Sequence, residues 1–265
     1  MCLILFAHHA DPRYRLVAAA NRDEFFKRPT DPADYWSDAR QVLAGRDLEK
    51  GGTWMGVTTD ARWAAVTNFR DGASPDPGTR SRGELVAGFL RGPASAHDYA
   101  ASIAKHSHAY HGFNLLLGDS QGLHYLSNRD DSSMMLAPGI YGLSNRFLDS
   151  PWPKVERGKQ ALRAALTEPV GPDRLIENLL GLLADRRTAD DAALPSTGVS
   201  HDWERLLSAA FIVAPNYGTR ASTVLLIDRE GGVHFREKSF GEGGELIEDR
   251  RYRFDSNPDS LVATA

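Results

Sequence analysis

Cysteine is almost absent from this sequence: among 265 residues there is one, Cys2, directly after Met1. One cysteine cannot form an intramolecular disulfide, and a chain of this length can bury a core without such cross-links. We therefore expect a reducing compartment, and the cytoplasm in particular. The position of the only thiol, second in the chain, needs a separate explanation.

Strong charge and long apolar runs are also missing. The formal net charge is −4, so nothing favours a nucleic-acid partner. The apolar residues 3–7 are too few for a signal-peptide core and lack a basic segment before them. No run approaches the ~20 apolar residues of a membrane-spanning helix. We expect no membrane span and no leader; the oligomeric state stays open.

The first residues of the sequence predict a β-hairpin. Residues 2–8 and 15–20 are apolar strands, and Asp11 and Pro12 between them favour a turn. A turn centred near Pro12 places Cys2 opposite Arg22. The polar run at residues 21–24 then lies beside the N-terminus.

A second hairpin follows two glycines. Its strands span residues 53–58 and 62–68, with a turn at 59–61. The open end of this hairpin brings Trp54 close to Asn68 and Phe69. Each hairpin therefore carries a polar cluster at one end, as expected for a site at a sheet edge.

The rest of the chain alternates pairs of helices with pairs of strands. Ser81 and Glu84 have capping-box spacing before an apolar run. Helices are predicted at residues 85–90, 96–105, 153–166 and 172–185, strands at 112–117, 122–127, 209–213, 222–228 and 233–238, and a loop at 190–201. This order favours antiparallel sheets covered by helices. We expect one domain, residues 1–265, with a loose polar tail after about residue 253.

Cys2 has two interpretations. It can be a small buried hydrophobe in a strand, or it becomes the N-terminal residue and a nucleophile once Met1 is removed. An α-amine has a pKa of ~7.7–8.0 and a thiol ~8.5, so the amine can accept the thiol proton. Arg22 could then stabilise the thiolate, and Asp23 could hold the α-ammonium group.

Several short motifs occur in a characteristic order. They are the run Asn21-Arg22-Asp23-Glu24 after the Met-Cys strand, then residues 51–56, Thr67-Asn68, residues 81–83, residues 141–145 and residues 217–220. With this ordered set the chain resembles the NRDE family, also called the transport-and-Golgi-organisation family. The resemblance extends to about residue 240.

The resemblance implies an α+β fold of the N-terminal-nucleophile hydrolase kind, in which two antiparallel sheets lie between helical layers in the order αββα. Related penicillin V acylases and bile-salt hydrolases use a cysteine, an arginine, an aspartate, two asparagines and a late arginine. The matching positions are Cys2, Arg22, Asp23, Asn68, Asn145 and Arg220. Here the first arginine and the aspartate are adjacent, whereas those hydrolases separate them. Adjacent strand residues point to opposite faces, so only one of the two is expected to face the cysteine unless the strand has ended before them.

In this reading the chain is a cysteine N-terminal-nucleophile amidohydrolase or acyl transferase acting on an amide or thioester. Asn68 or Asn145 would donate to the oxyanion, and Arg220 would steady the thiol or a substrate carboxylate. The residues expected to line the ligand site are Asn21, Glu24, Trp54 and Phe69. No cofactor is required. The alternative is a non-catalytic protein that binds haem, acyl-CoA or a lipid, so that the partner is a small acyl or anionic apolar ligand.

Other polar residues carry weaker signals. His106, His108 and His111 have a spacing that could hold a metal, but a solvated helix end explains them better. The pair at residues 8–9 could ligate haem iron, although only one of two adjacent strand residues faces a given side. Lys154 could meet an anionic ligand, with a solvated surface position as the simpler expectation.

Overall fold

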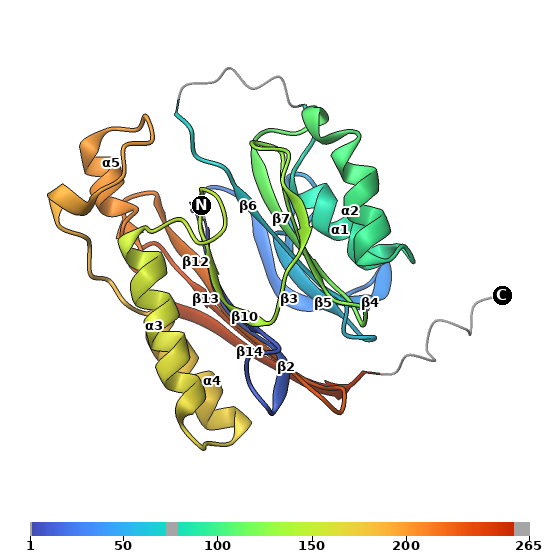
Figure 1. Cartoon of the computed structure of the whole chain (residues 1–265). Helices are drawn as coiled ribbons and strands as arrows, with labels where there is room; N and C mark the ends of the chain where they lie inside the picture. The colour runs from blue at the N-terminus through green and yellow to red at the C-terminus, as the bar shows by residue number, and fades with distance from the viewer. Residues whose placement is uncertain (1, 73–78, 257–265) are drawn as a thin grey trace.

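Two antiparallel sheets of seven strands lie face to face, with helices on both outer sides (Figure 1). The computed structural model describes residues 2–72 and 79–256. Met1, whose removal the nucleophile hypothesis requires, lies outside these ranges, as do residues 257–265 of the predicted tail. The order helix, sheet, sheet, helix confirms the predicted αββα sandwich.

The first sheet, sheet A, contains both the first and the last strand of the chain. Its strand order is β10-β1-β2-β12-β13-β14, with β11 beside β12. The bounds are β1 Cys2–His8, β2 Tyr14–Phe25, β10 Gly139–Leu143, β11 Val213–Ala214, β12 Tyr217–Asp228, β13 Gly232–Phe240 and β14 Leu246–Asp255. Strand β2 lies between β1 and β12, so its polar end is flanked by the N-terminal strand and by a late strand.

The second sheet, sheet B, is a simple meander in the order β3 to β9. The bounds are β3 Thr30–Trp36, β4 Ala39–Asp47, β5 Met55–Thr58, β6 Trp63–Asn68, β7 Phe113–Gly118, β8 Leu123–Ser127 and β9 Ser133–Met135. Helices α1 (Gly83–Arg91) and α2 (Ala96–Ala104) cover its outer face, followed by the 3-10 turn η1 (Ser107–Ala109). Glu84 accepts a hydrogen bond from the Ser81 backbone, which is half of the predicted capping box.

Sheet A is covered by α3 (Pro153–Thr167) and α4 (Pro172–Leu183). Each begins with a proline in its first turn, where the missing N–H costs no hydrogen bond. The turn η2 (Asp191–Ala193) and α5 (His201–Leu206) follow. Among the described residues, no helix is both long and apolar enough to span a membrane.

Strand β1 is apolar throughout because both of its faces are buried. Ile4 and Phe6 pack between the two sheets, whereas Leu3 and Leu5 pack against the α3–α4 layer. Burying one such side chain contributes about 1.5–3 kcal/mol. The run that opens the sequence is therefore a central strand, held on both sides, with Cys2 at its end.

The structure corrects several predicted elements. Strands β3, β4 and β14 were not predicted, because their exposed sides carry many charged residues. The strand predicted at residues 209–213 is wrong, since only Val213 of it belongs to a strand. Strand β14 continues to Asp255, two residues beyond the approximate start predicted for the tail.

Candidate functional site

Cys2 and Arg22 face each other across the first hairpin. Their Cα atoms are register partners in the β1–β2 pair, as the turn at Pro12 predicted. Opposite residues of an antiparallel pair project to the same face, here the face between the two sheets. Because β2 continues to Phe25, Asp23 projects to the other face. The adjacent arginine and aspartate therefore act on Cys2 from different sides.

Asp23 is anchored on the helix side of sheet A. Its side chain is 1% exposed, and its Oδ1 accepts a hydrogen bond of 2.7 Å from the Thr219 hydroxyl on β12. Burial raises the pKa of the Asp23 carboxyl, while the positive charge of Lys154 opposes this shift. The backbone of Asp23 also hydrogen-bonds the Cys2 thiol. Asp23 therefore interacts both with the Cys2 thiol and with Lys154 on the helix side of sheet A.

The Cys2 thiol is 7% exposed, and burial raises its pKa above the ordinary thiol value. The negative charge of Asp23 raises the pKa further. The positive charge of the N-terminus, the charge of Arg22 and the Asp23 backbone hydrogen bond lower it, but burial is the largest effect. At neutral pH this thiol is protonated, so nucleophilic attack requires a base that removes its proton.

Arg220 occupies a β-bulge. The β12–β2 register shifts between Thr219 and Ala221, which leaves Arg220 as the extra residue and re-aims its side chain. Its Nη1 donates to the backbone carbonyls of Phe25, Phe26 and Arg28 at 3.1, 3.3 and 3.1 Å. Arg220 therefore holds the turn after β2 as well as lining the cavity described below.

The two predicted asparagines have different places. Asn68 ends β6 and lines the cavity next to Cys2. Asn145 is fully buried and does not line it; its Nδ2 donates to the Asn68 carbonyl oxygen at 3.0 Å. The neighbouring Ser144 hydroxyl donates to the Cys2 carbonyl oxygen at 2.9 Å. Asn68 is thus the candidate oxyanion donor, and Asn145 positions its backbone.

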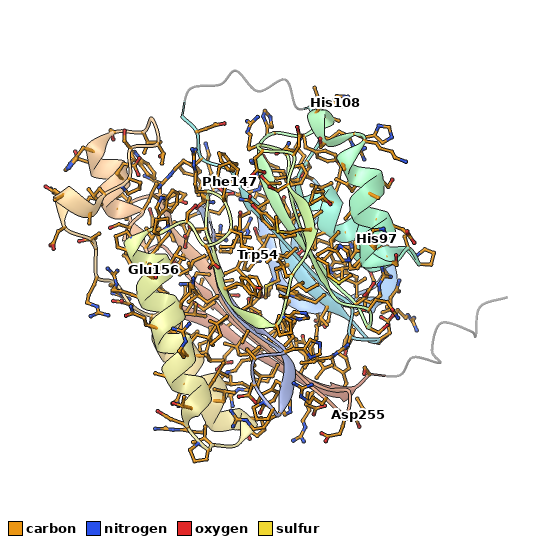
Figure 2. All side chains as sticks on the ribbon, viewed as in Figure 1. Trp54, His97, His108, Phe147, Glu156 and Asp255 are labelled. Carbon is orange, nitrogen blue, oxygen red and sulfur yellow. The ribbon has the colours of Figure 1, made fainter. Side chains whose placement is uncertain are left out.

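A cavity of about 460 Å³, here called the central cavity, opens between the two sheets above Cys2. Its lining includes Trp54, which Figure 2 shows in the space between the sheets. The basic lining residues are Arg22, Arg28, Arg46, Lys50, Arg80, Arg82 and Arg220, and the acidic ones are Asp23, Glu24, Asp31, Asp47, Glu237 and Glu248. Burial raises the pKa of the carboxyl groups of Asp23 and Glu237. The lining carries seven basic and six acidic residues, and its basic members include Arg22 and Arg220.

Two of the four predicted ligand residues, Glu24 and Trp54, line the central cavity. Asn21 does not, because strand alternation turns it toward the helices. There its Nδ2 donates to the carbonyl oxygens of Leu183 and Ala210 at 2.9 and 2.7 Å. Phe69 packs on Phe147, with ring centroids 4.9 Å apart, and also lies outside the lining.

Sequence reasoning missed two buried charged residues. Lys154, expected at a solvated surface, is 3% exposed at the start of α3, and burial lowers its pKa to about 8. Glu237 on β13 is 4% exposed and accepts hydrogen bonds from the Ala33 backbone at 2.7 Å and the Thr223 hydroxyl at 3.1 Å. Helical spacing could have found Lys154, which lies one and two turns before the buried Gly158 and Leu162.

The histidines do not form a shared site. His111 lines the central cavity, whereas His8 lies at the other end of β1 from Cys2. Burial lowers the pKa of His8 to about 4, and the neighbouring charge of His9 adds to this. Within the described residues, no three His, Cys, Asp or Glu side chains are placed to hold a metal ion.

Comparisons with known proteins agree with this arrangement. The structure of a Caenorhabditis elegans N-acylethanolamine-hydrolyzing acid amidase ortholog matches with a TM-score of 0.52 at 9% identity, covering 85% of this chain and 92% of that one. This likeness shows a shared fold, and it confirms the predicted N-terminal-nucleophile hydrolase-like architecture. The Transport and Golgi organization protein 2 homolog of Bos taurus is 38% identical over 263 residues, covering 90% of this chain and 93% of that protein.

A more distant relative, Transport and Golgi organization protein 2 of Drosophila melanogaster, is 30% identical over 263 residues, with 90% of this chain and 92% of that protein covered. The family model described as Transport and Golgi organisation 2 matches residues 1–242. That match includes the polar end of β2, the Asn68 strand, the Asn145 turn and Arg220. The chain belongs to the Transport and Golgi organisation 2 family.

Proposed function

We propose that this protein is a cysteine-dependent acyl-transfer enzyme that cleaves an amide or a thioester. The observation that carries the proposal is the placement of the only thiol, Cys2, on the central cavity directly across from Arg22. A structural cysteine needs no such cavity and no facing cation. The reducing cytoplasm, where we expect the protein to act, would keep this thiol free.

The reaction begins once Met1 has been removed. The α-amine of Cys2 accepts the thiol proton, and the sulfur forms a bond to the substrate carbonyl carbon. The tetrahedral intermediate collapses with cleavage of the bond to the leaving nitrogen or sulfur, which takes the proton from the α-ammonium group. Water, or an acceptor nucleophile, then cleaves the acyl-cysteine thioester and regenerates the thiol.

The raised pKa of the buried thiol makes the base essential to this scheme. Asp23, on the opposite face of β2 from Arg22, would orient the α-ammonium group while Arg22 stabilises the developing thiolate. The Asn68 side chain would donate to the oxyanion, a contribution of roughly 3–4 kcal/mol for one donor.

The substrate class follows from the lining of the central cavity. Arg22 lies at its floor, and Arg220 lies at the bulge of β12. An acyl compound with acid groups, such as an acyl-CoA thioester, would place those acids near the arginines and its apolar part near Trp54. We therefore expect anionic thioesters to be better substrates than neutral amides.

Intact-mass spectrometry of the purified protein tests this proposal. We expect Met1 to be absent, and we expect an acyl adduct after incubation with acyl-CoA thioesters that Cys2→Ala does not form. Arg28→Gln is a matched control for Arg22→Gln, because Arg28 also lines the cavity but is ion-paired with Asp47 at 2.6 Å. Retained Met1, or full turnover by Cys2→Ala, would contradict the proposal.

A second candidate is a carrier of an anionic apolar ligand such as haem, acyl-CoA or a lipid. The buried, protonated thiol and the arginines of the central cavity favour it. A carrier would bind its ligand within a few-fold of wild type in Cys2→Ala, form no adduct, and bind more weakly in Arg22→Gln. Haem as the ligand predicts a Soret-band shift on titration, and an unchanged spectrum rules it out.

A further inference from the structure

A second cavity lies on the helix side of sheet A. It has a volume of about 300 Å³ and shares no lining residue with the central cavity. Leu3 and Leu5 of β1 form its apolar floor, and the small residues Gly158 and Gly181 form its walls on α3 and α4. Figure 1 shows these two helices side by side over sheet A. We call this space the helix-side cavity.

The helix-side cavity holds positive charge that the protein leaves poorly compensated. Lys154, 3% exposed, lines it and makes no hydrogen bond or ion pair with any residue in ranges 2–72 and 79–256; the nearby negative charge acting on it is Asp23. Arg157 also lines it, but this side chain is 31% exposed, its Nη2 donates to the Arg187 carbonyl oxygen at 2.9 Å, and its Nε lies 3.7 Å from Asp185. A buried cation without such partners is costly, so an anion beside Lys154 would stabilise the fold.

The one acid in the lining is already engaged. Asp185 accepts hydrogen bonds from the Arg187 side chain at 2.8 and 2.9 Å, and it lies 3.7 Å from the Arg157 Nε. Asp185 is thus paired with Arg157 and Arg187, and Lys154 is the cation of the lining that this carboxylate does not pair with. The cavity therefore combines a buried ammonium group, that of Lys154, with an apolar lining that includes Leu3 and Leu5.

We propose that the helix-side cavity binds a small carboxylic acid with a hydrocarbon tail. The carboxylate lies between Lys154 and Arg157, and the tail lies along Leu3 and Leu5. A volume of 300 Å³ corresponds to about ten groups the size of a water molecule, at ~30 Å³ each. Octanoate, with eight carbons and two oxygens, matches this size.

Gly181 offers a way to fill the cavity without disturbing the fold. A methyl group added at Gly181 meets no heavy atom within 4 Å, and this glycine lies inside α4, where most other residues are better helix formers. Gly181→Leu therefore occupies the cavity and leaves the backbone in place. Gly171, which is equally open but lies outside the cavity, provides the matched control Gly171→Leu.

The experiment is calorimetric titration of the whole protein with sodium octanoate and with octan-1-ol as the uncharged analogue. We expect octanoate to bind wild type and Gly171→Leu equally, and at least tenfold more weakly to Gly181→Leu. Lys154→Met should lose octanoate affinity by a similar factor but keep its affinity for octan-1-ol. Cys2→Ala should bind octanoate as wild type does, which separates this site from the proposed catalytic one.

Two results would overturn the proposal. One is the absence of octanoate binding to wild type at millimolar concentration. The other is unchanged octanoate affinity in a folded Gly181→Leu variant, which would place the bound acid elsewhere, such as near Arg22 in the central cavity. Thermal unfolding of each variant, followed by circular dichroism, establishes that it is folded.

Discussion

At the scale of single residues, the site depends on which face of β2 each polar side chain occupies. Arg22 shares the face of the Cys2 thiol, and Asp23 lies on the other. Since the cation lowers the thiol pKa, Arg22→Gln should raise it and slow alkylation of Cys2 by iodoacetamide about tenfold at pH 8. The rate is measured by intact mass as a function of pH. Arg28→Gln, in which a paired arginine is lost, should keep the wild-type profile; equal slowing in both variants would refute a specific role for Arg22.

Lys154 leads to a prediction about stability and pH. Burial lowers its pKa from 10.5 in the unfolded chain to about 8 in the fold. Between these values the unfolded state binds more protons, so this residue makes the protein more stable as the pH rises from about 8 toward 10.5. Below pH 8 it destabilises the fold by about 3 kcal/mol.

The measurement is the free energy of unfolding in urea at several pH values, taken as the difference between Lys154→Met and wild type. Subtraction removes the contributions of titrating groups that do not interact with Lys154, so that the remaining pH dependence belongs to Lys154 and to Asp23 and Cys2, whose charges act on it. We expect the stabilisation by methionine to be largest below pH 8 and to decline above it. A difference that does not change with pH would show that Lys154 is not buried as a cation.

The residues of the site show what a sequence can predict. The turn at Pro12 and strand alternation were enough to place Cys2 opposite Arg22. The same alternation explains why the Asn21 side chain points toward the helices and away from the central cavity, but only once the length of β2 is known. The position of Lys154 required the packing of α3 on the sheet, because a charged residue after Trp152 looks like a solvated helix end.

At the scale of elements, the wall of the central cavity depends on a close approach between two glycines. A methyl group added at Gly52 would lie 2.6 Å from the Gly83 carbonyl carbon at the start of α1. Gly52→Ala should therefore displace α1 and destabilise the protein by about 1–3 kcal/mol. Gly171→Ala, in open space, should change the stability by less than about 0.5 kcal/mol. Urea unfolding measures both, and equal effects would show that α1 adjusts freely.

The elements that could be predicted are those with one clear apolar period. The predicted bounds lie within three residues of the observed ones for helices α3 and α4 and for the hairpin of β5 and β6. Strands β3 and β14 could not be predicted from the sequence. Both are edge strands whose charged residues remain exposed, and such a pattern resembles a loop. The site is little affected, since its predicted residues come from the inner strands and the turn after β10.

At the scale of the whole molecule, the central cavity exists only while the two sheets stay together. The sheets meet at Ala33 of β3, whose backbone N–H donates to Glu237 and whose carbonyl oxygen accepts from the Tyr252 hydroxyl at 2.9 Å. Glu237 also accepts from the Thr223 hydroxyl within sheet A. The closing edge of the sandwich is therefore held by polar contacts around one buried carboxyl group as well as by the apolar core.

Replacing Glu237 by leucine keeps the side chain buried but removes both acceptors. The Ala33 N–H and the Thr223 hydroxyl then lose their partners, and each unsatisfied buried group costs about 1–3 kcal/mol. We expect Glu237→Leu to lower the free energy of unfolding by about 2–4 kcal/mol and Tyr252→Phe by about 0.5–1.5 kcal/mol. Because the apolar core between the sheets remains in Glu237→Leu, tryptophan fluorescence and circular dichroism should still give one coincident transition in urea. Separate transitions in Glu237→Leu would instead show that the sheets can unfold independently and that the cavity opens along this edge.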